Sequence, residues 1–233
     1  PLDTYLEQQR AELASIIDRN TREDGSYATA IGSLNLSRHS KPHNFAPVLA
    51  QPAAIGVVAA FAKSIGAAKF FDAGDVQANG FQIVEDDRPG DTYTETGASY
   101  MGFAVSALLG SALAEKPRYS IAFTGDGSFM MNPQILIDGI EHGVRGAILL
   151  LDNRRMAAIS GLQVAQYGRD YRTNDSVAVD YLAMARSVSG VCALDGGASA
   201  ESLNAALEEA HAYPGLSLVH APVYYGERPE GGM

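Results

Sequence analysis

The sequence predicts an α/β fold in which a doubly wound, mostly parallel sheet is flanked by helices. Short apolar runs alternate with helical segments along most of the chain, as expected of βαβ units. The run at residues 147–151 is continuously apolar, which is typical of a parallel strand that is covered on both faces. A chain of 233 residues fits one large domain of this class.

The first 51 residues are predicted to form a helix and a connector. Residues 2–20 carry apolar side chains at helical spacing among charged ones, which predicts an amphipathic helix. Residues 35–52 contain three prolines and should be extended. His39 and His43 lie in this connector, where a solvated loop and a contact to substrate or a partner both remain open.

From residue 52 onward, strands and helices are expected to alternate up to residue 222. Pro52 suits the first turn of a helix that continues to residue 64. The expected strands are 69–72, 119–123, 147–151, 191–194 and 216–220, and the further expected helices are 99–114, 132–142, 181–187 and 200–211. The polar residues 160–175 are predicted to be a mobile loop, and the glycine-rich residues 223–233 a flexible tail. The domain organisation is therefore 1–51, 52–222 and 223–233.

The amino-acid composition limits the kinds of molecule that the protein is expected to bind. Hydrophobic residues make up 46% of the chain and charged residues 19%, and the formal net charge is −10. This acidic balance argues against a nucleic-acid partner, which would require clustered Lys and Arg. No apolar run approaches the roughly 20 residues that span a bilayer, and no N-terminal signal pattern is visible. A cytoplasmic protein that binds neither nucleic acid nor membrane is expected.

Two of the expected strands end in polar residues that suit a metal and a phosphate. Strand 119–123 leads to Asp126, and strand 147–151 leads to Asn153, 27 residues further along. Adjacent parallel strands could deliver both side chains to one crevice at their carboxyl ends. Carboxylate, amide and carbonyl oxygens suit Mg²⁺. Gly125 and Gly127 let backbone N–H groups approach a phosphate, and Ser128 adds a hydroxyl.

Gly125-Asp126-Gly127, followed at this spacing by Asn153, resembles the metal–diphosphate motif of thiamine diphosphate enzymes. With residues 96–103 and 149–153 in the same order, the chain resembles the diphosphate-binding domain of the acetolactate synthase and 2-oxo acid decarboxylase superfamily. Residues 152–163 most resemble the branch that contains trihydroxycyclohexanedione hydrolase and sulfopyruvate decarboxylase. The resemblance extends over about residues 52–222 and implies the thiamine diphosphate-binding fold.

The resemblance implies a role for individual residues. Mg²⁺ would be bound by the side chains of Asp126 and Asn153 and by the backbone carbonyl of Arg155. Met101 matches the bulky residue that holds the cofactor in its bent conformation. The residues expected to bind thiamine diphosphate are Gly74, Asp75, Ser99, Met101, Gly125, Gly127, Ser128 and Met156.

Two positions depart from the family pattern. The family usually has glycine where Arg155 stands, although a ligand that acts through its carbonyl tolerates a side chain if its φ is negative. Asp75 places an acid beside an anionic diphosphate, which is unfavourable unless the acid is protonated or faces away.

The resemblance further implies an enzyme that makes or breaks a C–C bond next to a carbonyl. Its substrate would be a small 2-oxo acid or diketone, and decarboxylation, carboligation and diketone hydrolysis all remain open. The activating glutamate of the family lies on a separate pyrimidine-binding domain, so no catalytic residue is assigned to this chain. The sequence has room for one such α/β unit, which implies a partner subunit in a heteromer such as α₂β₂, or a fragment of a longer enzyme.

Two other functions compete with this interpretation. Haloacid-dehalogenase-like phosphatases also use a Gly-Asp-Gly turn for Mg²⁺, but they need an early Asp-x-Asp and a second acid soon after the turn. Neither occurs here in the expected context. A non-catalytic subunit with a nucleotide-binding-like fold is the second alternative.

Overall fold

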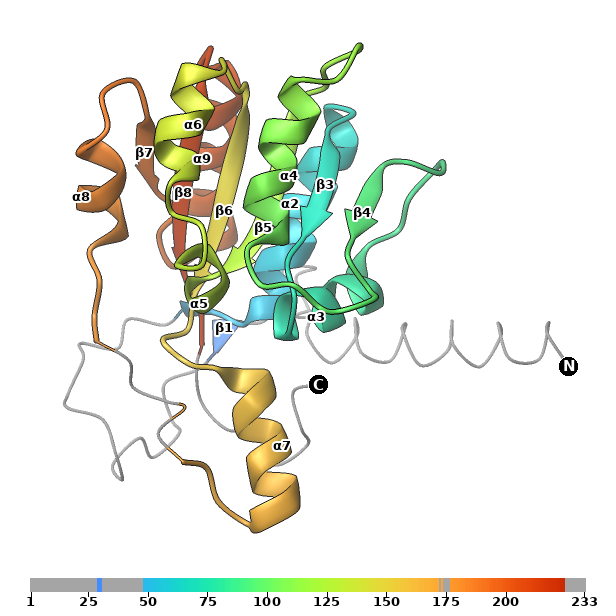
Figure 1. Ribbon diagram of the computed structural model, residues 1–233, viewed down its shortest axis with the longest axis vertical. Coiled ribbons are helices and arrows are strands. Elements are labelled where there is room, and N and C mark those ends of the chain that lie inside the picture. The colour runs from blue at the N-terminus through green and yellow to red at the C-terminus, as the bar shows by residue number, and fades with distance from the viewer. Residues whose placement is uncertain (1–28, 31–47, 172, 174–176, 225–233) are drawn as a thin grey trace, which may run out of the picture.

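The computed structural model describes residues 29–30, 48–171, 173 and 177–224. Within these residues, the core is a six-stranded sheet in the order β4-β3-β5-β6-β8-β7, and each pair of neighbours is parallel (Figure 1). Its strands are β3 (Ala68–Phe71), β4 (Thr92–Thr94), β5 (Ser120–Gly125), β6 (Gly146–Asp152), β7 (Cys192–Asp195) and β8 (Leu216–Pro222). A short antiparallel pair joins β1 (Thr29–Ala30) to β2 (Val48–Leu49).

Helices cover both faces of the sheet, which confirms the predicted doubly wound α/β class. The helices are α2 (Gln51–Ser64), α3 (Asp75–Ile83), α4 (Phe103–Ala112), α5 (Asp126–Phe129), α6 (Ile135–Glu141), α7 (Ala157–Tyr167), α8 (Tyr181–Arg186) and α9 (Ala200–Ala212). One apolar cluster packs α2, α3 and α9 on one face, and a second packs α4, α6 and α8 on the other. Helix α7 projects below the carboxyl ends of the strands (Figure 1).

The two central strands, β5 and β6, show why their sequences are continuously apolar. Ile121 and Phe123 of β5 face the α2–α9 cluster, whereas Ala122 faces the α4–α6 cluster. Leu149 and Ile148 of β6 divide between the two faces in the same way. All five side chains are fully buried. Burying a large aliphatic or aromatic side chain contributes roughly 1.5–3 kcal/mol, so these strands anchor the fold.

The chain changes direction across the sheet between β3 and β5. The connection from β3 leads outward to the edge strand β4, whereas β5 leads to β6 on the opposite side. In open α/β sheets, ligands bind outside the carboxyl ends of the strands at such a reversal. The residues that follow β3, β5 and β6 therefore lie where a ligand is expected.

Three sequence-based expectations differ from the structure. The helix expected over 99–114 begins only at Phe103, because Ser99 (φ 54°) and Gly102 (φ 89°) adopt left-handed backbone conformations that no helix can include. The prediction of a loop over 160–175 is wrong for the first half of that range, since α7 continues to Tyr167 and ends at Gly168 (φ 71°). Helix α3 and strand β4 were not expected, because the sequence from 75 to 98 has weak periodicity.

Several expectations concern residues that the structure does not describe. The N-terminal helix over 2–20, both histidines of the connector and the tail from 225 onward lie outside the described residues. Among the helices that are described, none combines the length and the hydropathy that a bilayer crossing requires.

Candidate functional site

The site is organised around two side chains at the carboxyl ends of β5 and β6. These strands are neighbours in the sheet, and Gly125 is paired with Leu151 in their register. Asp126 is the first residue of α5, directly after β5, and Asn153 directly follows β6. Both are buried, with exposed fractions of 6% and 9%. Adjacent strands therefore deliver a carboxylate and a carboxamide to the same end of the sheet, as the sequence predicts.

A tight turn follows β6 and contains the third predicted metal ligand. The Asp152 carboxylate accepts a hydrogen bond from the Arg154 N–H at 3.1 Å, and Asn153 Oδ1 accepts one from the Arg155 N–H at 3.0 Å. Arg154 has a φ of 52°, in the left-handed region. Arg155 is not among the residues with positive φ, so it meets the backbone condition that a carbonyl ligand with a side chain requires.

The environment of Asp126 favours a bound cation. Burial, followed by the nearby charge of Asp152, raises the pKa of Asp126 to about 6, although hydrogen bonding by the Gly127 N–H and the charge of Arg154 oppose the rise. No Lys or Arg forms an ion pair with Asp126 among the described residues. Those residues also contain no cluster of three or more His, Cys, Asp or Glu side chains around a metal position. An ion here would therefore need amide and backbone oxygens in addition to the Asp126 carboxylate.

Gly127 lies between two methionines that the sequence analysis assigned to the cofactor. A Cβ at this position would lie 3.0 Å from Met156 Sδ and 3.5 Å from Met101 Cε. Glycine therefore leaves backbone exposed between the two side chains, where a phosphate could approach it. Ser128, the next residue, is buried. The structure thus brings together Met101, Gly127, Ser128 and Met156 from three separate segments of the chain.

The turn after β3 contributes Gly74 and Asp75. Gly74 has a φ of 80° and precedes Asp75, the first residue of α3. Burial raises the pKa of Asp75 to about 6, although the positive charge of Arg155 lowers it in part. Asp75 Oδ1 is buried and has no hydrogen-bond partner among the described residues. The charge of Arg155 acts on Asp75, so this acid lies near the turn after β6, and one of its carboxylate oxygens is left unsatisfied by the described part of the chain.

Asp72 is a structural centre of the site that the sequence analysis did not identify. Its fully buried carboxylate accepts hydrogen bonds from the Gly102 N–H at 2.7 Å and from the Thr124 hydroxyl at 2.8 Å. A third comes from the Ala73 N–H at 3.1 Å. These hydrogen bonds connect the residues around Met101 and Gly102, called the Met101 segment below, to β3 and β5. An acid at the end of an expected strand, the same pattern as Asp126, was the signal that could have revealed it.

The loop before α4 is held by a second acid. The Glu95 carboxylate accepts hydrogen bonds from the Ala98 and Gly97 N–H groups, which lower its pKa. Ser99 lies in this exposed turn. Together with Asp72, Glu95 fixes both ends of the segment that carries Met101.

Comparison with known proteins agrees with this geometry. The family "Thiamine pyrophosphate enzyme, C-terminal TPP binding domain" matches residues 72–221. Similar proteins include 3D-(3,5/4)-trihydroxycyclohexane-1,2-dione hydrolase of Lacticaseibacillus casei, which is 38% identical over 107 residues. That match covers 44% of this chain and 16% of the enzyme. The enzyme of the same name from Bacillus subtilis (strain 168) is 34% identical over 128 residues, which are 52% of this chain and 20% of that protein.

Solved structures share the fold. Benzoylformate decarboxylase from Polynucleobacter necessarius superposes with a TM-score of 0.70 at 18% identity, over 82% of this chain and 36% of that one. The thiamine diphosphate-dependent 4-hydroxybenzoylformate decarboxylase of Rhodococcus jostii RHA1 also gives 0.70, at 20% identity, over 83% and 36% of the two chains.

The family match extends over more than half of the chain and includes every expected site residue. The curated relatives are much longer, since their matched segments amount to 16% and 20% of their lengths. Thiamine diphosphate is confirmed as the cofactor of the family to which the sequence analysis pointed. The protein therefore belongs to the thiamine pyrophosphate enzymes, and residues 72–221 are a C-terminal TPP binding domain of that family.

Proposed function

We propose that this chain is the diphosphate- and Mg²⁺-binding part of an enzyme that makes or breaks a C–C bond next to a carbonyl. The observation that carries the proposal is the placement of buried Asp126 and Asn153 at the ends of adjacent strands. When bound, thiamine diphosphate supplies the nucleophilic carbon and the electron sink for such chemistry. The residues of this chain bind and orient that cofactor.

The proposed metal ligands are the Asp126 carboxylate, the Asn153 side-chain oxygen and the Arg155 carbonyl. Oxygen ligands of this kind suit Mg²⁺, which is commonly shared with phosphate oxygens. A divalent ion would also offset the electrostatic cost of the buried Asp126 carboxylate. The exposed backbone of Gly127 and the hydroxyl of Ser128 would donate to the diphosphate.

The remaining predicted residues surround this point. Met101 and Met156 flank Gly127 and would exclude water from the cofactor while fixing its shape. The other proposed contacts are Gly74, Asp75, Ser99 and Gly125. The raised pKa of Asp75 favours its protonated form below about pH 6, which reduces repulsion between this acid and a diphosphate.

The substrate class that we propose is a small 2-oxo acid or a diketone. Relatives that match about half of the chain are hydrolases of a cyclohexanedione, and the structural neighbours are decarboxylases of aryl-substituted 2-oxo acids. The family assignment leaves no support for the phosphatase alternative. A non-catalytic subunit remains the competing function, and cofactor binding without turnover in the complete assembly would favour it.

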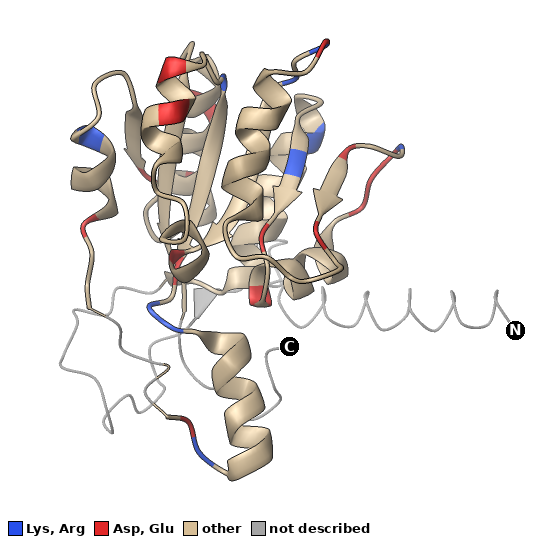
Figure 2. Cartoon of the chain, viewed as in Figure 1, with Lys and Arg blue, Asp and Glu red and all other residues tan. Residues whose placement is uncertain are grey.

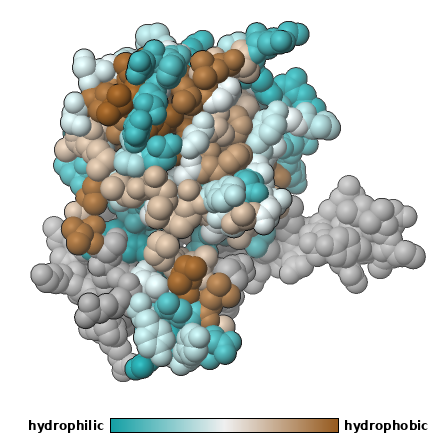
Figure 3. Space-filling model, viewed as in Figure 1, coloured by the Kyte–Doolittle hydropathy of each residue, from teal (hydrophilic) through white to brown (hydrophobic). Residues whose placement is uncertain are grey.

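We propose that a pyrimidine-binding domain outside this TPP binding domain completes the enzyme. Large apolar side chains are exposed at the site end of the molecule and on α7 (Figure 3); they are Tyr100, Met130, Met131, Ile159 and Leu162. Exposed apolar side chains that gather on one surface are typical of an interaction site. The partner is a separate subunit, in a heteromer such as α₂β₂, or further sequence of one longer enzyme. Full turnover by the purified chain with added cofactor would contradict both forms of the proposal.

Calorimetric titration of the full chain with thiamine diphosphate tests the metal site. We expect binding that requires Mg²⁺. We also expect the Asp126→Ala variant to bind the cofactor more than about 100-fold more weakly, a larger loss than is usual when a residue that only orients a metal ligand is replaced. Asp138→Ala is the matched control, since it removes an acid from α6 on the outside of the fold. The proposed site would be rejected if the affinity for thiamine diphosphate did not depend on Mg²⁺, or if Asp126→Ala bound the cofactor as tightly as the wild type.

A further inference from the structure

The acid that precedes Asn153 connects two strands at the site. Asp152 is the last residue of β6, and one of its carboxylate oxygens, Oδ1, accepts the Arg154 N–H at 3.1 Å. Its other oxygen, Oδ2, lies 3.0 Å from Nε2 of His220 on the neighbouring strand β8. Because a carboxylate only accepts, Nε2 carries the hydrogen and donates it. Both oxygens of Asp152 are thus engaged, one by the turn and one by the next strand.

The turn that Asp152 holds is strained. The left-handed region is unfavourable for a residue other than glycine, and Arg154 has a φ of 52°. The hydrogen bond to its N–H offsets part of that cost. This turn determines where the Asn153 side chain and the Arg155 carbonyl point, because it sets the backbone direction between the two residues.

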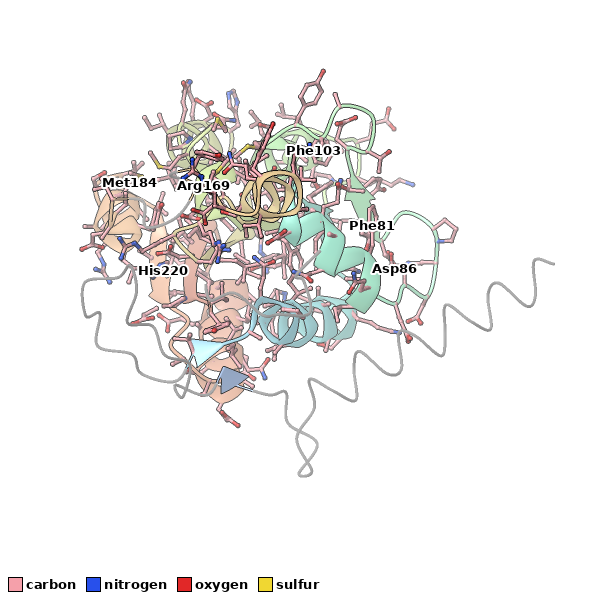
Figure 4. The ribbon with its side chains drawn as sticks, turned by 90° about the horizontal axis from the view of Figure 1, so that it is seen from below. Phe81, Asp86, Phe103, Arg169, Met184 and His220 are labelled. Atoms are coloured by element: carbon pink, nitrogen blue, oxygen red, sulfur yellow. The ribbon has the colours of Figure 1, made fainter. Side chains whose placement is uncertain are left out.

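His220 is held in place by its surroundings. Figure 4, which views the site end of the molecule, shows its side chain among those of β8. Its ring lies 5.8 Å from the ring of Tyr181, at the start of α8, and Tyr181 in turn packs edge-on against Phe129 of α5. The side chain of His220 is 18% exposed. Burial, followed by the charges of Asp126 and Asp152, raises the pKa of Tyr181.

We propose that His220 is a positioning residue of the metal–diphosphate site: it holds Asp152, and Asp152 fixes the turn that aims Asn153 and the Arg155 carbonyl at the ion. This inference rests on the proposed function. In this arrangement His220 acts through its hydrogen bond to Asp152 and is not one of the proposed metal ligands. Partners of this kind, which orient the groups that bind a metal, change metal affinity by about 10- to 100-fold when they are replaced.

Titration of the full chain with Mn²⁺ in the presence of thiamine diphosphate, followed by electron paramagnetic resonance of the free ion, measures the effect directly. We expect His220→Leu to weaken Mn²⁺ binding about tenfold, the lower end of that range. His220→Gln should restore most of the affinity, because its amide N–H can still donate to Asp152. Asp152→Asn should weaken binding to a similar extent, and combining it with His220→Leu should add little, since both break one interaction.

His142→Leu is the matched control, since it removes an exposed histidine that caps α6. It should bind Mn²⁺ as the wild type does. A lower melting temperature of His220→Leu with unchanged affinity would overturn the inference, because a purely structural residue would behave in that way. If His220→Leu does not fold, wild-type affinity in Asp152→Asn would overturn it equally. Retention of Mn²⁺ by Asp126→Ala would instead reject the proposed function, which separates the two failures.

Discussion

The pKa values of the acids are shifted in opposite directions at the two ends of the central sheet. At the carboxyl end, burial raises the pKa of Asp72, Asp75 and Asp126. At the amino end, hydrogen bonds from Arg118 (at 2.8 Å) and Arg88 lower the pKa of Asp91. Figure 2 shows charged residues at both ends. The difference is one of pairing: Asp91 forms ion pairs with arginines at the amino end, whereas within the described part of the chain Asp72, Asp75 and Asp126 form no ion pair at the carboxyl end.

Even the buried charge at the amino end has a partner. Lys69 of β3 is almost fully buried, and its ammonium lies 2.9 Å from Asp86. Lys63 at the end of α2 lies 2.8 Å from Asp87. Asp126, by contrast, is buried and forms no ion pair with Lys or Arg among the described residues, a cost that serves no structural purpose. Acids with such perturbed pKa values cluster at functional sites.

The largest expected effect on stability concerns Asp72, the one acid at the carboxyl end that the chain does satisfy. Asp72→Ala would leave the N–H groups of Gly102 and Ala73 and the Thr124 hydroxyl without their acceptor. Each buried unsatisfied donor costs about 1–3 kcal/mol, and relief of the buried charge offsets part of the sum. We expect a net loss of about 3 kcal/mol in the free energy of unfolding, measured by urea titration.

Asp72→Asn is the control for this prediction. It keeps a side-chain oxygen for the two N–H groups, and the Thr124 hydroxyl can accept from its amide. We expect this variant to retain most of the stability. A loss below about 1 kcal/mol in Asp72→Ala would show that the contacts of Asp72 do not hold the Met101 segment.

The second effect is the dependence of the free energy of unfolding on pH, to which the Asp126 carboxyl group contributes. Its pKa is higher in the folded chain than in the unfolded chain, so the folded state binds the proton more tightly. The contribution of this carboxyl group to stability without metal is therefore fully present below about pH 4 and is lost as the pH rises through about 6. A rise from near 4 to about 6 corresponds to roughly 3 kcal/mol for this carboxyl group. Asp75 should act in the same direction.

Urea titrations between pH 4 and pH 7, with a chelator present, measure this dependence. The Asp126→Asn variant should show a shallower decline than the wild type, because it carries no titrating carboxyl group at that position. Mg²⁺ with thiamine diphosphate should also reduce the decline. Equal pH dependence in the two proteins would show that Asp126 is not strained by burial.

The smallest effect is expected at the amino end. Because the pKa of Asp91 is lowered, its contribution to stability is present above the ordinary aspartate range and is lost as the pH falls, the reverse of Asp126. Asp91→Asn should destabilise the chain slightly at pH 7 and low salt, and high salt should remove the difference, since the guanidinium groups of Arg88 and Arg118 reach solvent. A larger loss than for Asp72→Ala would reverse the comparison of the two ends.

The sequence was most informative where a strand runs directly into polar residues. Asp126 and Asn153 were predicted because each follows an apolar run, and the pairing of β5 with β6 brings them to one end of the sheet. Helix α7 was missed because several of its apolar side chains are exposed, so it lacks the periodicity of a helix packed on a core. Strand β4 was missed because three residues give no detectable alternation.

The sequence by itself determined the fold class, the family and the residues that end the two central strands, because these depend on local patterns and on short motifs. Only the tertiary structure decided that β8 lies beside β6, which brings His220 to Asp152 across 68 residues of sequence. It also decided that Asp72 fastens the Met101 segment. Strand order and long-range hydrogen bonds depend on how complete elements pack, and no local stretch of sequence encodes that packing.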